Sequence, residues 1–365
     1  MNTGGQEQLL PTCIKLWGWS MVVTAGIIAN PASGKDIRRL VAYGTVFDNQ
    51  EKVNIVRRAL LGLAATGVER VLFMPDYYGI VYKAVNGLSS QHHLSLEVIP
   101  LEMELTGTQI DSCRAAQELN RLGAGCIITL GGDGTNRMVA KGCGRIPLVP
   151  VSTGTNNVFP EMVEGTIAGL AAGLAASGDI DGPGTIIRTK KLTIFKCGQP
   201  ADIALIDAVV LQDNFIGSRA VWDTERIKQI VVTRGEPQNI GISSIAGHLD
   251  PIGISEPRGL AIDFEGDEIV VLAPIAPGLI RPVRLHGYRP VALDEEIAIG
   301  HIPCVIALDG EREVEVRPGE TAAIRLDSGG PNVVNIRNIL RQAVASGFFR
   351  RAEIIGNSNW LKEGQ

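Results

Sequence analysis

The sequence predicts an α/β domain, then an all-β domain and a final helix, on the basis of three patterns. Up to about residue 180, apolar β-branched runs alternate with segments of helical periodicity, which is typical of a parallel sheet with helical crossovers. From Thr185 onward, short apolar runs follow one another between Gly, Pro and Asp turns. Residues 335–349 return to helical spacing. Because 365 residues exceed what one hydrophobic core usually supports, two domains are expected.

We place the boundaries where these patterns change. The apolar stretch 9–28 is too interrupted for a membrane helix. Residues 1–20 are expected to form a loose extension before the first strand, and Met21 is our hypothesis for the natural start. The α/β domain is assigned to 21–180 and the β-rich domain to 181–328. The segment 329–365 is expected to supply a C-terminal helix that packs on the first domain.

The first domain is expected to contain five strands separated by helices. The strands are predicted at 22–29, 70–74, 94–100, 126–130 and 146–151, and the helices near 37, at 48–65, up to about 88, and at 111–122, 137–142 and 161–176. Ligand loops of a parallel sheet lie at the carboxyl ends of its strands. The loops that begin at Asn30, Pro75, Gly131 and Ser152 are therefore expected to share one edge.

The second domain is expected to be built from strands alone, before the last helix. Strands are predicted at 186–188, 191–195, 203–211, 227–233, 259–263, 268–273, 297–300, 304–308, 314–316 and 322–326. The final helix has an apolar side formed by Ile336, Ile339, Leu340, Ala343, Val344 and Phe348.

Composition narrows the classes of partner. The formal net charge is −5 and no basic run occurs, so nucleic acid and anionic membrane surfaces are not expected partners. None of the six cysteines forms a Cys-x-x-Cys pair, and no histidine has metal-ligand spacing. These features favour a cytoplasmic protein. We also expect a small-molecule substrate and a homo-oligomer.

The most informative motif follows the strand predicted at 126–130, where the chain reads Gly131-Gly132-Asp133-Gly134-Thr135-Asn136-Arg137. Strand, glycine turn and helix together present backbone N–H groups to phosphate, and we expect these glycines to allow positive φ and close approach. A carboxylate beside phosphate indicates phosphoryl transfer, with Asp133 near a metal or a reacting proton. The alternative is a tight turn in which Asp133 only caps. The spacing fits neither a Walker loop nor a dinucleotide fingerprint.

Two more polar loops follow predicted strands. The first contains Asn30-Pro31-Ala32-Ser33-Gly34-Lys35, in which a lysine is placed for a phosphate. The second contains Ser152-Thr153-Gly154-Thr155-Asn156-Asn157, whose hydroxyl and amide groups can bind phosphate, ribose or base. Each alone is compatible with an ordinary turn or helix cap. Three such loops on one edge indicate a nucleotide site.

These three loops, with the later Ala307-Leu308-Asp309-Gly310-Glu311, resemble the NAD kinase and diacylglycerol kinase superfamily. The closer similarity is to its ATP-NAD kinase-like branch, the acetoin-catabolism protein X (AcoX) family. The resemblance covers most of residues 22–350. It implies a NAD kinase-like fold: a Rossmann-like nucleotide domain, a β-rich domain, an active site in the cleft, and a C-terminal helix that returns to the first domain.

The resemblance also implies roles for individual residues, with ATP and Mg²⁺ as cofactors. The glycines 131, 132 and 134 would line the triphosphate, and Thr135 would cap the following helix. Asp133 would activate the acceptor hydroxyl or hold magnesium, and Asp309 matches an acidic position near the reacting phosphate. The remaining nucleotide-binding positions would be Asn30, Ser33, Gly34, Lys35, Asn136, Thr153, Gly154, Thr155, Asn156 and Asn157.

The sequence departs from the family at the acceptor. NAD kinases carry an Asn-Glu pair that grips the dinucleotide, and here Ile206 replaces the Asn and Asp207 the Glu. An aliphatic side chain cannot make the amide's hydrogen bonds, although Asp207 can still bind substrate. Two hypotheses therefore remain open: a small-molecule kinase acting on NAD or another hydroxyl-bearing metabolite, and a non-catalytic sensor of ATP or NAD.

Overall fold

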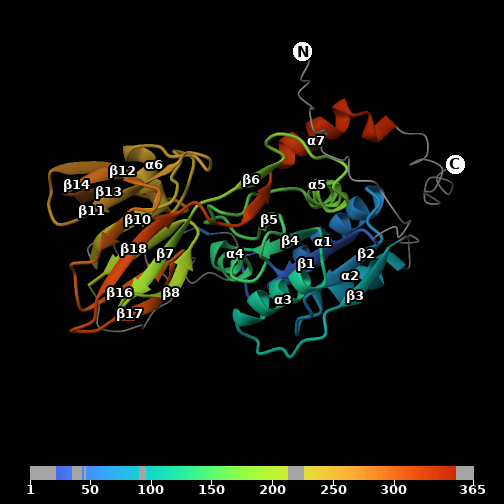
Figure 1. Ribbon diagram of the computed structural model, residues 1–365, viewed down its shortest axis with the longest axis horizontal. Helices are drawn as coiled ribbons and strands as arrows, with labels where there is room; N and C mark the ends of the chain where they lie inside the picture. Colours follow the sequence, from blue (N-terminus) through green and yellow to red (C-terminus); the bar gives the residue numbers. More distant parts are fainter. Residues whose placement is uncertain (1–21, 35–42, 45–46, 90–95, 213–225, 351–365) are drawn as a thin grey trace, which may run out of the picture.

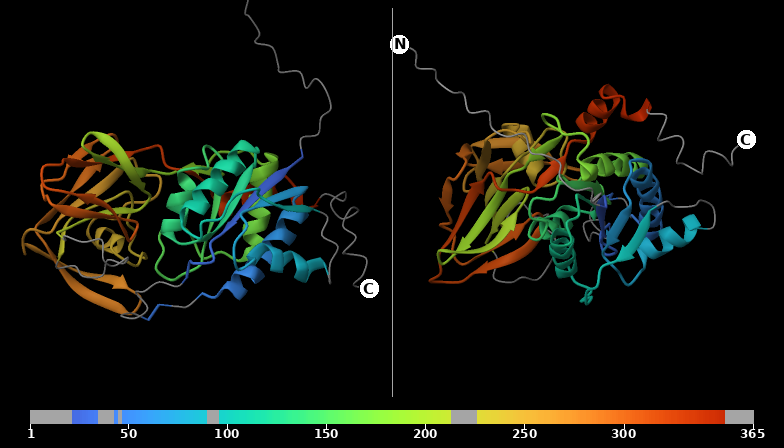
Figure 2. Two further views of the ribbon diagram at one scale, coloured as in Figure 1. Left: turned by 90° about the horizontal axis from the view of Figure 1, so that it is seen from below. Right: turned by 45° about the vertical axis from the view of Figure 1, so that its right-hand side comes forward.

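The computed structural model describes the chain except for residues 1–21, 35–42, 45–46, 90–95, 213–225 and 351–365. The expected N-terminal extension, Lys35 and the helix predicted near residue 37 lie outside the described residues. An α/β domain and a β-rich domain lie side by side in Figure 1, and Figure 2 shows the same arrangement from two further directions. This architecture confirms the predicted fold class.

The first domain is built on a seven-stranded sheet with the order β3-β2-β1-β4-β5-β19-β6. Its strands pair in parallel except for β6, which runs antiparallel to β19. The strands are β1 (Thr24–Ala29), β2 (Arg70–Phe73), β3 (Glu97–Pro100), β4 (Cys126–Gly131), β5 (Leu148–Ser152), β6 (Ile186–Arg188) and β19 (Asn332–Val334). Both β6 and β19 join this sheet from beyond residue 180, so the chain crosses between the domains twice.

Helices cover both faces of this sheet. One core cluster contains α1 (Asn49–Ala65), α2 (Ile80–Ser89), α5 (Gly165–Ser177) and α7 (Ile336–Ala345). The other contains α3 (Ile110–Arg121) and α4 (Asp133–Ala140). The predicted return of the last helix is thereby confirmed, since Ile339 and Ala343 are buried with α5. Val344 was wrongly assigned to the apolar side, because 57% of it is exposed.

The glycine loop differs from prediction in two respects. Helix α4 begins at Asp133, four residues before the predicted start, so the aspartate lies in the first helical turn. Gly131, Gly132 and Gly134 are absent from the residues with positive φ, and Gly132 has an extended conformation with φ −98°. The expectation of positive φ was therefore wrong, and the glycines must be required for another reason.

The second domain contains antiparallel sheets with two hydrophobic clusters, one on each side of the largest sheet. The six-stranded sheet has the order β14 (Gly287–Ala292), β11 (Arg258–Asp263), β10 (Ile227–Val232), β9 (Asp207–Leu211), β16 (Cys304–Leu308) and β17 (Glu311–Val316). A four-stranded sheet has the order β15 (Glu296–Ala298), β18 (Ala322–Asp327), β7 (Lys191–Lys196) and β8 (Gln199–Ala204). The hairpin of β12 (Ile269–Ala276) and β13 (Leu279–Leu285) completes the domain together with α6 (Ser243–Leu249).

The sequence missed several elements of this domain. The strand predicted at 203–211 is divided between β8 and β9, with a bend at Leu205 and Ile206. Helix α6 and the strands β13, β14 and β19 were not predicted. Over the parts of the chain that the structure describes, no helix has both the length and the apolarity needed to cross a bilayer.

Helices α1 and α5 approach closely because glycines line their contact. An added Cβ at Gly62 would lie 2.5 Å from Thr166 O, and one at Gly169 would overlap Ala59 O. Gly165 and Gly173 repeat the spacing of four residues along α5, and their Cβ positions also meet α1 or the residue that ends it. Helix α5 is rich in Ala and Gly because its backbone contacts α1 along its length.

We expect Gly169→Val to lower the free energy of unfolding by more than about 2 kcal/mol, since the new side chain must push two helix backbones apart. Gly300→Val is the matched control, because nothing lies within 4 Å of a Cβ at that position. Urea unfolding followed by circular dichroism measures both variants. Equal unfolding midpoints would show that the α1–α5 contact tolerates the added volume.

Candidate functional site

The three polar loops meet at the carboxyl ends of β1, β4 and β5, which are neighbours in the sheet. The Asn30 side-chain amide donates a 2.9 Å hydrogen bond to Thr135 Oγ1, which joins the first loop to the glycine loop. The Ser33 and Thr153 hydroxyls lie 2.9 Å apart and join the first loop to the third. The prediction that these loops converge is confirmed.

Close packing explains the glycines in these loops. A Cβ at Gly131 would lie 2.5 Å from the Thr135 side chain, and one at Gly132 would lie 2.7 Å from Asn157 Oδ1. Gly34 has φ +76°, which favours glycine, and its Cβ would lie 2.7 Å from Thr153 O. Small residues therefore let the loops approach one another, in addition to any ligand.

The amide side chains of the site differ in their surroundings. Asn136 is fully buried, where it accepts a hydrogen bond from Thr129 Oγ1 at 2.6 Å and donates to Gly132 O at 2.9 Å. It supports the loop from beneath. Asn157 donates to Ser152 Oγ at 2.8 Å and to Gly154 O at 3.2 Å, while Thr155 is exposed. Asn156 faces Gly241 of the second domain, with its Oδ1 3.1 Å from a Cβ placed there.

The Asp133 carboxylate joins the glycine loop to the end of the third loop. Its Oδ1 accepts hydrogen bonds from Val158 N at 3.0 Å and Phe159 N at 2.7 Å. From the second domain, Arg234 Nη2 donates to Val158 O at 2.7 Å and to Phe159 O at 3.3 Å. The segment of Val158 and Phe159 thus donates its amides to the Asp133 carboxylate and accepts hydrogen bonds from the Arg234 guanidinium at its carbonyls. Neither domain alone provides both contacts.

Asp309, the second candidate acid, lies in the hairpin turn between β16 and β17. Its φ is 50° and that of Gly310 is 84°, as a two-residue hairpin turn with Asp-Gly requires. The carboxylate is enclosed and accepts hydrogen bonds from the Leu205, Ile206 and Asp207 amides. Burial raises the pKa of Asp309 to about 6, against the opposing attraction of Arg137 and the amides, and the charge of Asp133 adds to the rise.

The two acceptor positions are buried. Ile206 is 1% exposed and packs with Phe159 and Leu205, so this aliphatic residue belongs to a small core at the domain junction. Asp207 is 7% exposed at the start of β9, and its carbonyl accepts a 3.0 Å hydrogen bond from Asp309 N. The departure from the family at Ile206 therefore has a packing explanation.

Two buried cations beside the site were not predicted from the sequence. Arg137 is fully enclosed, and its guanidinium lies 2.8 Å from Glu313, 3.4 Å from Asp202, 3.6 Å from Glu311 and 3.8 Å from Asp309. Burial opposes its charge, but these carboxylates, Asp309 foremost, outweigh burial and raise the pKa of Arg137. All four acids come from the second domain, whereas Arg137 belongs to α4.

Lys52 of α1 is the other buried cation. Its ammonium donates to Asn30 O at 2.8 Å and Ser33 O at 2.7 Å, which fixes a positive charge directly beneath the first loop. A signal was available in the sequence, because Lys52 has helical spacing to Val56 and Ala59 and thus lies on the buried face. Arg137 gave no comparable signal, since its partners are remote in sequence.

The donor set fits a nucleotide better than a protein-bound metal cage. Within the described parts of the chain, no three or more His, Cys, Asp or Glu side chains gather so as to hold a metal ion. Mg²⁺ is usually held by one or two carboxylates together with substrate phosphates and water. Asp133 and a bound triphosphate would satisfy that requirement.

The raised pKa of Asp309 gives a pH-dependent stability with a defined sign. The folded protein holds this proton more tightly than the unfolded chain, so ionisation opposes folding. The stabilising contribution is complete below the unfolded pKa of about 3.9 and is lost as the pH rises through about 6. Relative to wild type, Asp309→Asn should therefore become more stable between pH 4 and 7, by up to roughly 3 kcal/mol. Urea unfolding at several pH values measures both proteins. A difference in free energy of unfolding that stays constant from pH 4 to 7 would contradict this prediction.

Comparison with known proteins agrees with this geometry. The family model for the ATP-NAD kinase N-terminal domain matches residues 25–180, and that for the acetoin catabolism protein X C-terminal domain matches residues 190–329. A curated relative, the acetoin catabolism protein X of Cupriavidus necator, is 40% identical over 329 residues. That match covers 87% of this chain and 91% of the relative. The chain therefore belongs to the acetoin catabolism protein X family, with a first domain of the ATP-NAD kinase type.

Proposed function

We propose that this protein is an ATP-dependent kinase that phosphorylates a hydroxyl group of NAD or a related small metabolite, in a process linked to acetoin catabolism. The observation that carries the proposal is the convergence of the three loops, joined by the Asn30–Thr135 and Ser33–Thr153 hydrogen bonds. Matches to a kinase-type first domain and to an acetoin catabolism protein support the reaction class and its metabolic setting.

The triphosphate would bind at the start of α4. The first backbone N–H groups of a helix point at a ligand placed there, and the helix dipole favours its negative charge. The buried ammonium of Lys52 beneath the first loop adds a fixed positive charge. Asn30, Ser33, Lys35, Thr153 and the residues that follow Thr153 would supply neutral donors and one further cation around the nucleotide.

Of the two candidate acids, Asp133 is the better placed for chemistry. It is only partly buried, and its main-chain hydrogen bonds fix the orientation of the carboxylate. An oriented carboxylate can position an acceptor hydroxyl and take its proton, or hold Mg²⁺ against the phosphates. Asp309 is enclosed, so we assign it to positioning: it holds the bend at Leu205 and Ile206 and helps to neutralise Arg137.

A non-catalytic sensor of ATP or NAD is the second candidate. It is favoured by the occupation of both carboxylates by backbone amides, which gives each a structural reason to be present. Ile206 and Asp207 are also buried, so their side chains do not present a surface to a dinucleotide. In this alternative, nucleotide would change the contacts between the domains without phosphoryl transfer.

Nucleotide binding is testable first. Millimolar Mg-ATP should raise the melting temperature of the protein, because ligand that binds only the native state stabilises it by about 2.7 kcal/mol at a hundredfold excess over the dissociation constant. Differential scanning fluorimetry with Mg-ATP, ATP alone and Mg²⁺ alone measures the effect. Gly132→Val should remove the shift, since its side chain would meet Asn157, while Gly300→Val should keep it. An unmoved wild-type melting temperature would refute the phosphate interpretation.

Catalysis is tested by Asp133→Asn. We expect phosphoryl transfer to fall by roughly 10²–10⁴-fold, as for loss of a general base, while nucleotide affinity stays equal or rises because a negative charge beside the triphosphate is removed. Wild type and variant are incubated with Mg-ATP and NAD, NADH, glycerol or sphingoid bases, and products are measured by mass spectrometry.

The matched control is Asp48→Asn, because Asp48 caps α1 through Glu51 N and asparagine caps equally well. This variant should retain full turnover. Retained turnover in Asp133→Asn would defeat the catalytic assignment. Nucleotide binding without any product in wild type would instead favour the sensor.

A further inference from the structure

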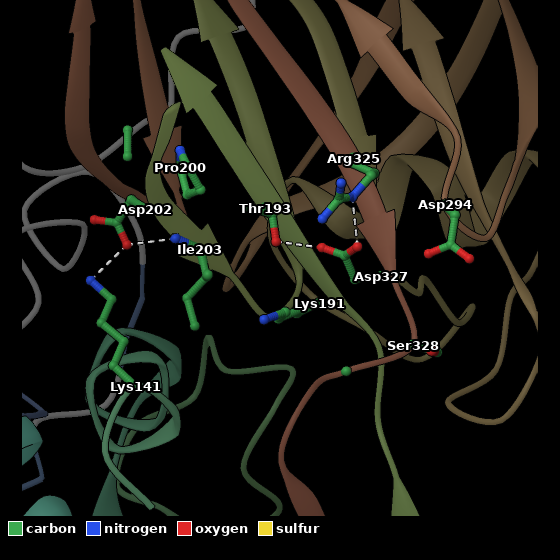
Figure 3. A pocket seen from close by; sticks show the side chains of 12 residues that line it. Lys141, Lys191, Thr193, Pro200, Asp202, Ile203, Asp294, Arg325, Asp327 and Ser328 are labelled. Atoms are coloured by element: carbon green, nitrogen blue, oxygen red, sulfur yellow. Dashed lines mark hydrogen bonds and ion pairs between the residues drawn. The ribbon is translucent and has the colours of Figure 1, made fainter. Parts of the chain in front are cut away.

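A cavity lies at the two crossings between the domains, apart from the three converging loops. It has a volume of about 590 Å³, within the range of small-molecule sites. Figure 3 shows it between the outer face of the four-stranded sheet and Lys141, which follows the last residue of α4. Because α4 has eight residues, its end beside Lys141 lies on the order of 12 Å along the helix from the glycine loop, and the cavity is lined by none of the three converging loops.

Both crossing segments contribute to the cavity wall. Lys191 is the first residue of β7, directly after the first crossing, and Ser328 and Gly329 belong to the second. The two segments are bonded to each other, since Thr189 N and Thr189 Oγ1 donate to Pro331 O at 3.1 and 2.8 Å. A molecule in the cavity would therefore touch both connections and, through Lys141, the first domain.

The cavity is lined by three cationic and three anionic side chains, but not all of them form ion pairs with one another. Lys141 lies 2.6 Å from Asp202, and Arg325 Nε lies 2.7 Å from Asp327, whose other oxygen accepts a hydrogen bond from Thr193 (Figure 3). Lys191 stands opposite Asp327 in the β7–β18 register, but both oxygens of that carboxylate are already engaged.

The cavity thus has an unused cation and an unused anion. Among the residues that the structure describes, the Lys191 ammonium and the Asp294 carboxylate make no hydrogen bond or ion pair, and Arg325 donates only through Nε. Lys191 and the remaining guanidinium nitrogens of Arg325 can bind an anionic group. Asp294 and the Ser328 hydroxyl can accept from a hydroxyl or ammonium group.

We propose that this cavity is a second ligand site, for a small metabolite with an anionic group at one end and a hydroxyl or ammonium group at the other. The anion would lie on Lys191 and Arg325, and the donor group would lie toward Asp294. The apolar side chains of Pro200, Ala201 and Ile203, on the far side of Lys191 from Asp294, close the other end of the cavity. Asp202 would sense the occupant, because its second oxygen lies 3.4 Å from Arg137.

Isothermal titration calorimetry tests this site with two anionic probes, glycerol 3-phosphate and L-glutamate, and with glycerol as the neutral control. We expect at least one anion to bind and glycerol not to bind at the same concentration. Binding of the phosphate alone or of the amino acid alone identifies which anion the site prefers. Absence of binding by both anions would overturn the proposal.

Four variants locate the binding. Lys191→Met should weaken it at least tenfold, and Ala201→Trp, at an exposed position on β8, should fill the cavity without disturbing a core. Lys228→Met removes a lysine of β10 that pairs with Glu265 and does not line the cavity, so it should leave binding unchanged. Gly132→Val alters the nucleotide loops and should also leave it unchanged. Loss of binding in Gly132→Val with retention in Lys191→Met would place the anion in the glycine loop and overturn the proposal.

Discussion

The structure depends most on one buried cation, the Arg137 guanidinium. Arg137 belongs to α4 of the first domain, and its guanidinium lies among four carboxylates of the second domain. The Asp309 side chain is fully enclosed, and Glu313 makes the shortest contact. Removing a charge from water costs several kcal/mol, which only well-placed partners offset. A shift of the second domain would separate these charges and lose the attraction that offsets their desolvation. The interaction therefore fixes how the domains sit against each other.

The same contact orders the candidate site. Arg137 lies in the helix that begins at Asp133, so whatever holds Arg137 also holds the glycine loop. Asp309 orients the bend at Leu205 and Ile206, and that bend packs on Phe159 at the end of the third loop. Arg234 then grips the carbonyls of the segment whose amides bind Asp133. The first domain supplies the loops, but the β-rich domain holds two of them in place.

This arrangement changes the meaning of residues that look functional. Asp309, Asp207 and Asn136 have the residue types expected at a kinase site, yet all three are buried, and the side chains of Asp309 and Asn136 are hydrogen-bonded within the protein. Asp133 combines both roles, since it binds two backbone amides and stays partly exposed. The glycines are also required by packing, as the neighbours of Gly131 and Gly132 show. Evolutionary retention of such residues would not by itself distinguish an enzyme from a sensor.

What the sequence determined was local or periodic. The alternation of strands and helices, the final helix, the cap at Asp48 and the convergence of three loops all follow from spacing and from the geometry of parallel sheets. The start of α4 was misplaced because a glycine-rich segment has poor helix propensity, which tertiary contacts overrode. Likewise, the continuous apolar run 203–211 hid a bend that the Asp309 carboxylate stabilises.

Only the tertiary structure decided which charges meet. Arg137 and Glu313 are 176 residues apart in the sequence. Asp309 lies 104 residues from Leu205, whose amide donates a hydrogen bond to its carboxylate. Nothing in a local pattern encodes such distances, because they depend on how two separately formed sheets are docked. The burial of Ile206, the contact of Arg234 with the third loop and the pairing of Lys141 with Asp202 share this origin. Spacing along the chain specified the loops, whereas desolvation and charge pairing between the domains specified the site.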